Sequence, residues 1–161
     1  MPVREPATAI RPGTVEGMTD DHDCDFCAAL AADSFEVVVR GDLVVAVLDR
    51  HPINPGHLLV LPLRHATDLA ALDTREVTEL ALVAQRADRA LRQVLGAAVE
   101  GTNLVMSNGS VADQGVPHAH LHVIPRASGD GYEFREDTTR YPVAPLDPAD
   151  RAAIAAHMRD G

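Results

Sequence analysis

Three histidines, His118, His120 and His122, alternate with apolar residues in one short segment. In an extended strand their side chains would share one face, with neighbouring Cα atoms roughly 6.5–7 Å apart and the outer two about 13 Å apart. The outer pair could not share one metal ion while the strand stays straight, so a catalytic zinc on all three is disfavoured. The spacing suits one nucleophilic imidazole better, because neutral imidazole attacks well when its other ring nitrogen is held as an N–H donor.

The only two cysteines, Cys24 and Cys27, form a Cys-x-x-Cys pair. Such a pair can be half of a tetrahedral zinc site, a redox motif or two ordinary reduced thiols. The redox interpretation needs a thioredoxin-like βαβ context, which the flanking residues do not show. A closed zinc site needs two further ligands, and the pair alone does not identify them.

The segment from His118 to Ile124 has the form His-φ-His-φ-His-φ-φ, where φ is apolar, and it resembles the signature of the histidine triad (HIT) superfamily of nucleotide hydrolases and transferases. The resemblance extends over roughly residues 24–135. Asn54 to Pro62 is similar to the family's Pro-Gly-His strand, and Ser107 to Gly109, followed by Gln114, is similar to its phosphate-side loop.

The resemblance implies nucleotidyl transfer through a covalent histidine, with no organic cofactor. His120 would be the nucleophile on the α-phosphorus, His122 would contact the phosphate and position the leaving group, and His57 would orient the nucleophile. The expected substrates are small nucleoside 5′-phosphoryl compounds, of the dinucleoside polyphosphate or nucleoside phosphoramidate type. Contacts to the ribose, and to the phosphate and leaving group, are expected from Asp49, Asn108 and Gln114.

Some members of the superfamily bind structural zinc through a cysteine pair and two distant histidines. The matching positions here are Cys24, Cys27, His65 and His118. The resemblance therefore implies a Cys₂His₂ zinc site, in which His118 is a metal ligand rather than a catalyst.

Two residues depart from the family's usual Gly-Gln-Ser/Thr before the triad: Asp113 and Gly115 flank Gln114. Gly115 lacks the hydroxyl that would meet the leaving group, and Asp113 adds negative charge near the phosphates. A nucleotide-binding or zinc-stabilised interaction protein with little catalysis is therefore a second hypothesis. A third is a metallohydrolase in which His118 and His120 are the metal ligands.

The composition excludes several other classes of function. The chain has 161 residues, with 24 acidic and 14 basic side chains and a net charge of −10. This balance argues against broad docking on nucleic acid or on an anionic membrane. No run approaches the roughly 20 apolar residues of a membrane span, and the N-terminus lacks the apolar region of a secretory signal. We therefore expect a cytoplasmic protein that binds neither nucleic acid nor membrane.

Five strands and one long helix must position these residues. Runs rich in β-branched and aliphatic residues predict strands at 35–39, 43–48, 57–61, 102–106 and 118–124. A capping box, Asp73 to Glu76, begins a helix whose apolar residues recur every 3.6 positions until Gly96. An alanine-rich segment predicts a C-terminal helix over 147–158.

Short connections favour antiparallel pairing, so the expected class is α+β: a five-stranded antiparallel sheet with one long helix and a C-terminal helix, as in the HIT-like fold. Residues 1–22, with several prolines and glycines, predict a disordered arm, and residues 23–161 predict a single domain. One covering helix leaves apolar surface and a sheet edge, which favours a homodimer.

Overall fold

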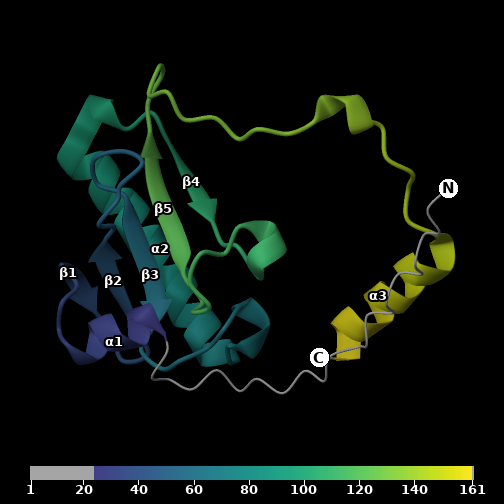
Figure 1. The fold of residues 1–161 in the computed structure, drawn as a ribbon, viewed down its shortest axis with the longest axis horizontal. Coiled ribbons are helices and arrows are strands. Elements are labelled where there is room, and N and C mark those ends of the chain that lie inside the picture. Colours follow the sequence, from purple (N-terminus) through teal and green to yellow (C-terminus); the bar gives the residue numbers. More distant parts are fainter. Residues whose placement is uncertain (1–23, 161) are drawn as a thin grey trace, which may run out of the picture. The chain divides into compact units, whose positions relative to one another are not determined.

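The computed structural model describes residues 24–160 (Figure 1), so the predicted arm over residues 1–22 lies outside the described residues. The chain divides into two compact units, one that ends at Asp130 and one that begins at Gly131. A single domain over residues 23–161 stays a prediction.

The first unit contains one five-stranded antiparallel sheet, with strand order β1-β2-β3-β5-β4. This confirms the α+β class and places β3, which directly follows His57, beside β5, which contains His122 (Figure 1). The elements of this unit, in chain order, are α1 (Asp25–Ala31), β1 (Val37–Arg40), β2 (Val44–Leu48), β3 (Leu58–Pro62), α2 (Thr74–Leu95), β4 (Gly101–Val105) and β5 (Leu121–Arg126).

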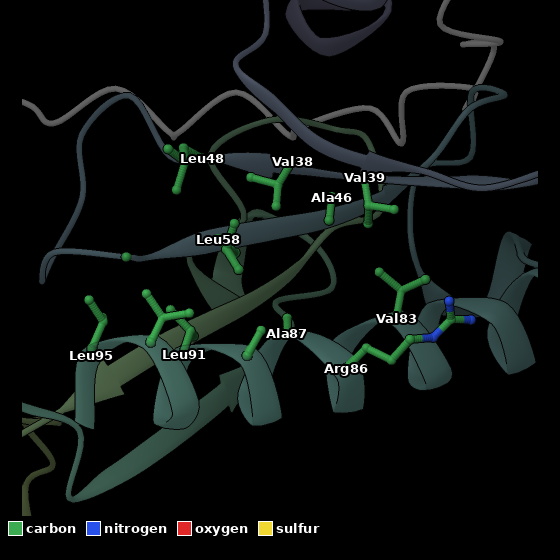
Figure 2. A pocket seen from close by; sticks show the side chains of 13 residues that line it. Val38, Val39, Ala46, Leu48, Leu58, Val83, Arg86, Ala87, Leu91 and Leu95 are labelled. Carbon is green, nitrogen blue, oxygen red and sulfur yellow. The ribbon is translucent and has the colours of Figure 1, made fainter. Parts of the chain in front are cut away.

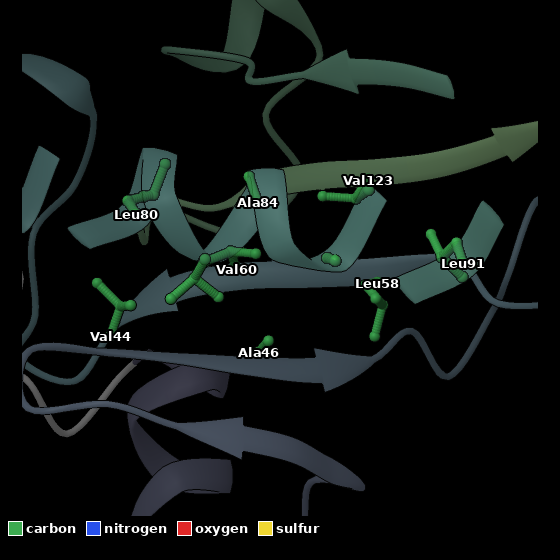
Figure 3. Close-up of a cluster of buried hydrophobic side chains, with 10 residues drawn as sticks. Val44, Ala46, Leu58, Val60, Leu80, Ala84, Leu91 and Val123 are labelled. Atoms are coloured by element: carbon green, nitrogen blue, oxygen red, sulfur yellow. The ribbon is translucent and has the colours of Figure 1, made fainter. Parts of the chain in front are cut away.

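Both faces of the central strands are buried. One face packs on α2, where β2 and β3 contribute Val44, Ala46, Leu58 and Val60 (Figure 3). The other face packs on α1, through Val45, Val47, Leu59 and Leu61 with Phe26 and Leu30. Because each fully buried aliphatic side chain contributes roughly 1.5–3 kcal/mol, these two layers fix the register of the strands that carry the site.

Helix α2 begins and ends as its sequence predicts. The Asp73 side chain accepts a hydrogen bond from the Glu76 N–H at 2.9 Å, and Glu76 Oε2 accepts one from the Asp73 N–H at 2.8 Å. Glu76 also accepts a 2.6 Å bond from Arg64, which ties the helix start to the segment after β3. Gly96, with φ of +57°, ends the helix in a conformation that favours glycine.

Two local features differ from the sequence prediction. The triad strand begins at Leu121 rather than at His118, so the first two triad histidines precede the regular ladder. Here the Ala119 N–H donates to the Ala66 carbonyl at 2.6 Å, outside the sheet pairing. Helix α1 was not predicted either, since a seven-residue helix is too short to show a clear period.

The second unit holds a helix, α3 (Pro148–Asp160), preceded by a loop that contains a short 3-10 helix over Thr138–Arg140. The helix matches the one predicted over residues 147–158. The Asp147 side chain accepts a hydrogen bond from the Ala149 N–H at 2.7 Å, which caps the helix start.

Candidate metal centre and candidate active site

The two cysteines and two histidines meet at the start of α1. Cys24 and Cys27 are three residues apart and so share one face of the helix. Cys27 Sγ lies 3.3 Å from His65 Nδ1 and 3.5 Å from His118 Nδ1, and Cys24 Sγ lies 3.5 Å from the same His118 atom. A tetrahedral zinc ion with ordinary bond lengths would separate sulfur and nitrogen ligands by about 3.6 Å. The four residues therefore fit a zinc ion.

A backbone carbonyl fixes the orientation of His118. Its ring is fully buried, and Nε2 donates to the Pro62 carbonyl oxygen at 3.0 Å. The proton on Nε2 leaves Nδ1 with a lone pair directed at the thiols, which is how protein carbonyls commonly orient histidine ligands of metals. His118 therefore belongs to the cysteine cluster, and it is not available as a nucleophile.

His120 has the opposite orientation, with its other nitrogen bonded to the backbone. Its Nδ1 donates to the His118 carbonyl oxygen at 2.6 Å, so the proton sits on Nδ1 and Nε2 carries a lone pair. The Phe26 ring packs against the imidazole in a T-shaped arrangement, with ring centroids 5.1 Å apart. The structure thus holds His120 in the tautomer that a nucleophile needs.

His57 and His122 face each other across the β3–β5 pair. The Ile53 N–H donates to His57 Nδ1 at 3.2 Å, which places the His57 proton on Nε2. That N–H in turn donates to His122 Nδ1 at 2.9 Å, so the His122 proton lies on its Nε2. Asp49 Oδ2 lies 3.5 Å from His57 Nδ1 and 4.0 Å from His122 Nδ1.

Burial keeps this pair neutral. Desolvation lowers the pKa of His57, against a smaller opposing effect of the Asp49 carboxylate. Desolvation, with the neighbouring His120 and His57, lowers the pKa of His122 to about 4. At neutral pH these side chains therefore act as N–H donors and acceptors rather than as cations.

A pocket of about 670 Å³ opens between the triad and α1. His120, His122 and Asp49 are among the residues that line it. Most of the remaining lining is apolar and includes Phe26 and Phe35. An apolar wall next to a carboxylate and two imidazoles suits a nucleoside joined to a phosphate, because base, ribose and phosphate each find a matching surface.

Among the pocket residues that the sequence did not single out as substrate contacts are Phe26, Arg50 and His51. In the sequence, the feature that could have pointed to Phe26 as a pocket residue was its position between the two cysteines. Arg50 and His51 directly follow the predicted ribose contact. A loop histidine is more often solvated than part of a site, and His51 is indeed exposed, although it lines the pocket.

Asn108 and Gln114 fasten a loop next to the triad. Asn108 Oδ1 accepts from the Leu69 N–H at 2.8 Å. Gln114 Oε1 accepts from the Gly109 N–H at 2.7 Å, while its Nε2 donates to the Thr67 carbonyl at 2.6 Å. Neither side chain lines the 670 Å³ pocket, so their predicted contacts with phosphate and leaving group stay predictions.

A second pocket, of about 380 Å³, lies between α2 and the strands β1 to β3 (Figure 2). Its lining is aliphatic, from residues such as Val38, Leu58 and Leu91, and its one charged side chain is Arg86. It offers no group for nucleotide chemistry.

The similarity to known proteins agrees with this site. A model of the HIT domain matches residues 32–129, and the chain belongs to the HIT family. It is 36% identical over 124 residues to an uncharacterised HIT-like protein of Mycobacterium tuberculosis, covering 73% of this chain and 85% of that protein. It is 41% identical over 95 residues to the AP-4-A phosphorylase of the same species, covering 58% of this chain but only 48% of the phosphorylase.

Among solved structures, the chain is similar to a zinc-bound histidine triad family protein from Mycobacterium smegmatis. The TM-score is 0.64 at 32% identity, with 88% of this chain and all of that chain (100%) covered. Within residues 24–160, no helix has the length and apolarity needed to cross a membrane.

Proposed function

We propose that this protein is a nucleotidyl hydrolase or transferase that acts on nucleoside 5′-phosphoryl compounds through a covalent intermediate on His120. The observation that carries the proposal is the 2.6 Å bond from His120 Nδ1 to the His118 carbonyl, which leaves Nε2 unprotonated beside the pocket. A histidine held in this way can attack phosphorus without first losing a proton.

The reaction proceeds in two displacements. His120 Nε2 attacks the α-phosphorus in line, the new P–N bond forms, and the bond from phosphorus to the leaving group breaks with its electron pair. The neutral His122 donates a hydrogen bond from its Nε2–H to the departing atom, which leaves with the electron pair and takes any proton it needs from solvent water. In the second displacement water attacks phosphorus, gives its proton to solvent, and its oxygen replaces His120 on phosphorus, which releases the nucleoside monophosphate.

His57 and Asp49 support this chemistry. His57 donates to His122 Nδ1 at 2.9 Å and so keeps the His122 proton on the nitrogen that faces the leaving group. Asp49 uses one oxygen to accept from the His51 N–H at 2.8 Å, and as a pocket-lining residue it keeps further lone pairs for ribose hydroxyls.

The substrate class follows from the pocket and from one relative. The similarity to an AP-4-A phosphorylase supports dinucleoside polyphosphates as substrates, and the same displacement cleaves nucleoside phosphoramidates. Phosphate could also replace water in the second displacement, which would make the protein a phosphorylase.

A binding protein with little turnover is the second candidate. The observation that favours it is the exposed carboxylate of Asp113, which lies in the loop fastened by Asn108 and Gln114. Calorimetry that shows nucleotide binding, with no product after prolonged incubation, would favour this candidate over the enzyme.

We also propose that Cys24, Cys27, His65 and His118 bind a structural zinc ion. The sulfur–nitrogen distances, the Nε2 proton of His118 and the zinc-bound relative support this. The ion would cross-link α1 to the segments around β3 and the triad. Because Phe26 packs against His120, that cross-link would also hold one wall of the pocket against the nucleophile.

The homodimer and the cytoplasmic location stay predictions. Strand β4 forms one edge of the sheet, and its Leu104 side chain is exposed. An edge of this kind pairs readily with a second copy. Sedimentation of the purified chain tests this, and a monomer at micromolar concentration would contradict it.

The covalent mechanism is tested by His120→Ala and His120→Asn, assayed on diadenosine tetraphosphate and on an adenosine phosphoramidate. We expect kcat/KM to fall by about 10⁴-fold or more, as for other catalytic nucleophiles. His157→Asn, on the exposed face of α3, is the matched control and should retain full activity. Activity that survives exhaustive chelation in the folded protein would exclude the metallohydrolase hypothesis.

A further inference from the structure

We propose that Arg126 and Asp130 are positioning residues for the histidine pair and act through Asn54. Together they hold the turn whose backbone N–H decides which nitrogen of His57 carries the proton. This inference rests on the proposed function for its effect on turnover, but the tautomer itself can be measured without substrate.

The network begins with a bidentate ion pair at the end of β5. Arg126 donates from Nε to Asp130 Oδ2 at 2.6 Å and from a terminal nitrogen to Oδ1 at 2.8 Å. A third Arg126 N–H donates to Asn103 Oδ1 on β4. The Asp130 side chain is only 10% exposed and that of Arg126 22% exposed. Two parallel bonds between largely buried charges fix the orientation of the carboxylate.

Asn54 connects this ion pair to the turn before β3. Its side-chain amide donates to Asp130 Oδ2 and to the Pro125 carbonyl, both at 2.8 Å, so both amide hydrogens are used. Its own carbonyl accepts from the His57 N–H at 3.0 Å. The side chain of Asn54 therefore anchors the turn to β5, while its backbone closes the turn on His57.

Helix α2 also packs against this turn. Gly56 has a φ of +88°, and a Cβ at this position would lie 2.8 Å from a Leu91 methyl carbon. A side chain at position 56 would be strained at this φ and would require the Leu91 side chain to move. The turn therefore contacts Leu91 of α2 on one side and the Arg126–Asp130 pair, through Asn54, on the other. These contacts restrict the position of the Ile53 N–H.

The Ile53 N–H is the group that sets the tautomer. It donates to His57 Nδ1, and His57 must then carry its proton on Nε2 and donate to His122. If the turn relaxed, His57 could instead place its proton on Nδ1, facing Asp49 Oδ2 at 3.5 Å. His122 Nδ1 would then lose its donor, and the His122 proton would move from the pocket side to the side facing His57.

This arrangement also explains why Arg126 is not a phosphate-binding cation. Its position at the end of the triad strand suggests such a role, but its guanidinium bonds to Asp130 and Asn103. Its charge stabilises the carboxylate that holds Asn54, so it acts on the reaction through the turn.

The test is the histidine tautomer in substrate-free protein, read from ¹⁵N chemical shifts of the imidazole rings. The variants are Asn54→Asp and Asp130→Asn. Asn54→Asp replaces the amide NH2 group, which supplies both donor hydrogens, by an acceptor oxygen, and Asp130→Asn neutralises the carboxylate with little change of shape. Ser128→Ala is the matched control, because Ser128 lies between Arg126 and Asp130 but its hydroxyl donates to Glu100 instead.

We expect His57 to be a pure Nε2–H tautomer in the wild type and in Ser128→Ala, and to populate the Nδ1–H form in both network variants. In those variants kcat should fall roughly 10- to 100-fold, as expected for small displacements of catalytic groups, with KM changed less than about threefold. Arg126→Lys should restore part of the loss relative to Arg126→Ala.

Network variants that fold but keep the wild-type His57 tautomer would overturn the proposal, whatever their melting temperature. If Asn54→Asp does not fold, Asp130→Asn alone decides. If the network variants shift the His57 tautomer but the wild-type protein has no measurable turnover, the positioning role is supported and the proposed function is contradicted. Failure of the positioning role can therefore be told apart from failure of the proposed function.

Discussion

Replacing one ligand of the cysteine–histidine cluster is expected to remove the metal and much of the stability of the first unit. His65→Asn is the most suitable change, since His65 is only half-buried and Asn keeps a polar side chain at the same place. The other three ligands lie on α1 and before β5, so a site with one ligand missing no longer joins these segments to the end of β3.

The size of the effect follows from linkage. With free zinc a thousandfold above its dissociation constant, metal binding stabilises the folded state by about 4 kcal/mol. Residues 24–130, roughly 107 in number, carry an unfolding entropy of about 0.22 kcal/mol per kelvin. The melting temperature should therefore fall by about 15–20 °C.

Elemental analysis and thermal unfolding measure this directly. We expect about one zinc per chain in the wild type and in the His157→Asn control, and far less in His65→Asn. A chelator should lower the wild-type melting temperature to that of His65→Asn and leave the variant unchanged. Wild-type protein without metal, whose melting temperature does not respond to a chelator, would refute the reasoning.

Three further outcomes are expected. His122 should titrate with a pKa of about 4 by NMR, well below a histidine peptide measured alongside; a midpoint near 6.5 would contradict the burial argument. The folded state binds this proton only at a lower pH than the unfolded chain does, so the free energy of unfolding should fall as pH drops from 6.5 towards 4. The fall should be at most about 1.4 kcal/mol per pH unit, and it should be less steep in His122→Asn. Leu61→Ala should cost about 2–5 kcal/mol in urea unfolding, whereas Leu104→Ala, at an exposed edge position, should cost under about 1 kcal/mol if the chain is monomeric. Asp49→Asn should raise KM for ribonucleotide substrates more than for their 2′,3′-dideoxy analogues, and equal effects on both would argue against ribose binding.

The sequence predicted best those elements whose signals are local. The capping box of Asp73 and Glu76 and the glycine at position 96 mark the two ends of α2 within a few residues of chain, and both are confirmed. The start of β5 was missed because it depends on a distant partner. Ala119 bonds to Ala66 rather than to the neighbouring strand, and nothing near Ala119 indicates this.

For the candidate site, the motif identified which histidines matter but not how their protons are arranged. The tautomers of His118 and His120 are set by two backbone carbonyls, at Pro62 and at His118 itself. The resemblance assigned His118 to the metal and His120 to the nucleophile, but side-chain types say nothing about such carbonyls, so the physical reason for this division is found only in the folded chain. The same limit applies to Asn54, whose amide meets a carboxylate 76 positions away.

The central claim is that His120 becomes covalently nucleotidylated, and intact-mass spectrometry after rapid mixing with nucleotide donors tests it most directly. We expect a transient mass increase of one nucleotidyl group, mapped to the peptide that contains His120 and absent from His120→Asn. The adduct should decay at a rate compatible with turnover, and faster with phosphate if the protein is a phosphorylase. Full turnover by His120→Asn, with no adduct on the wild-type chain, would contradict the account.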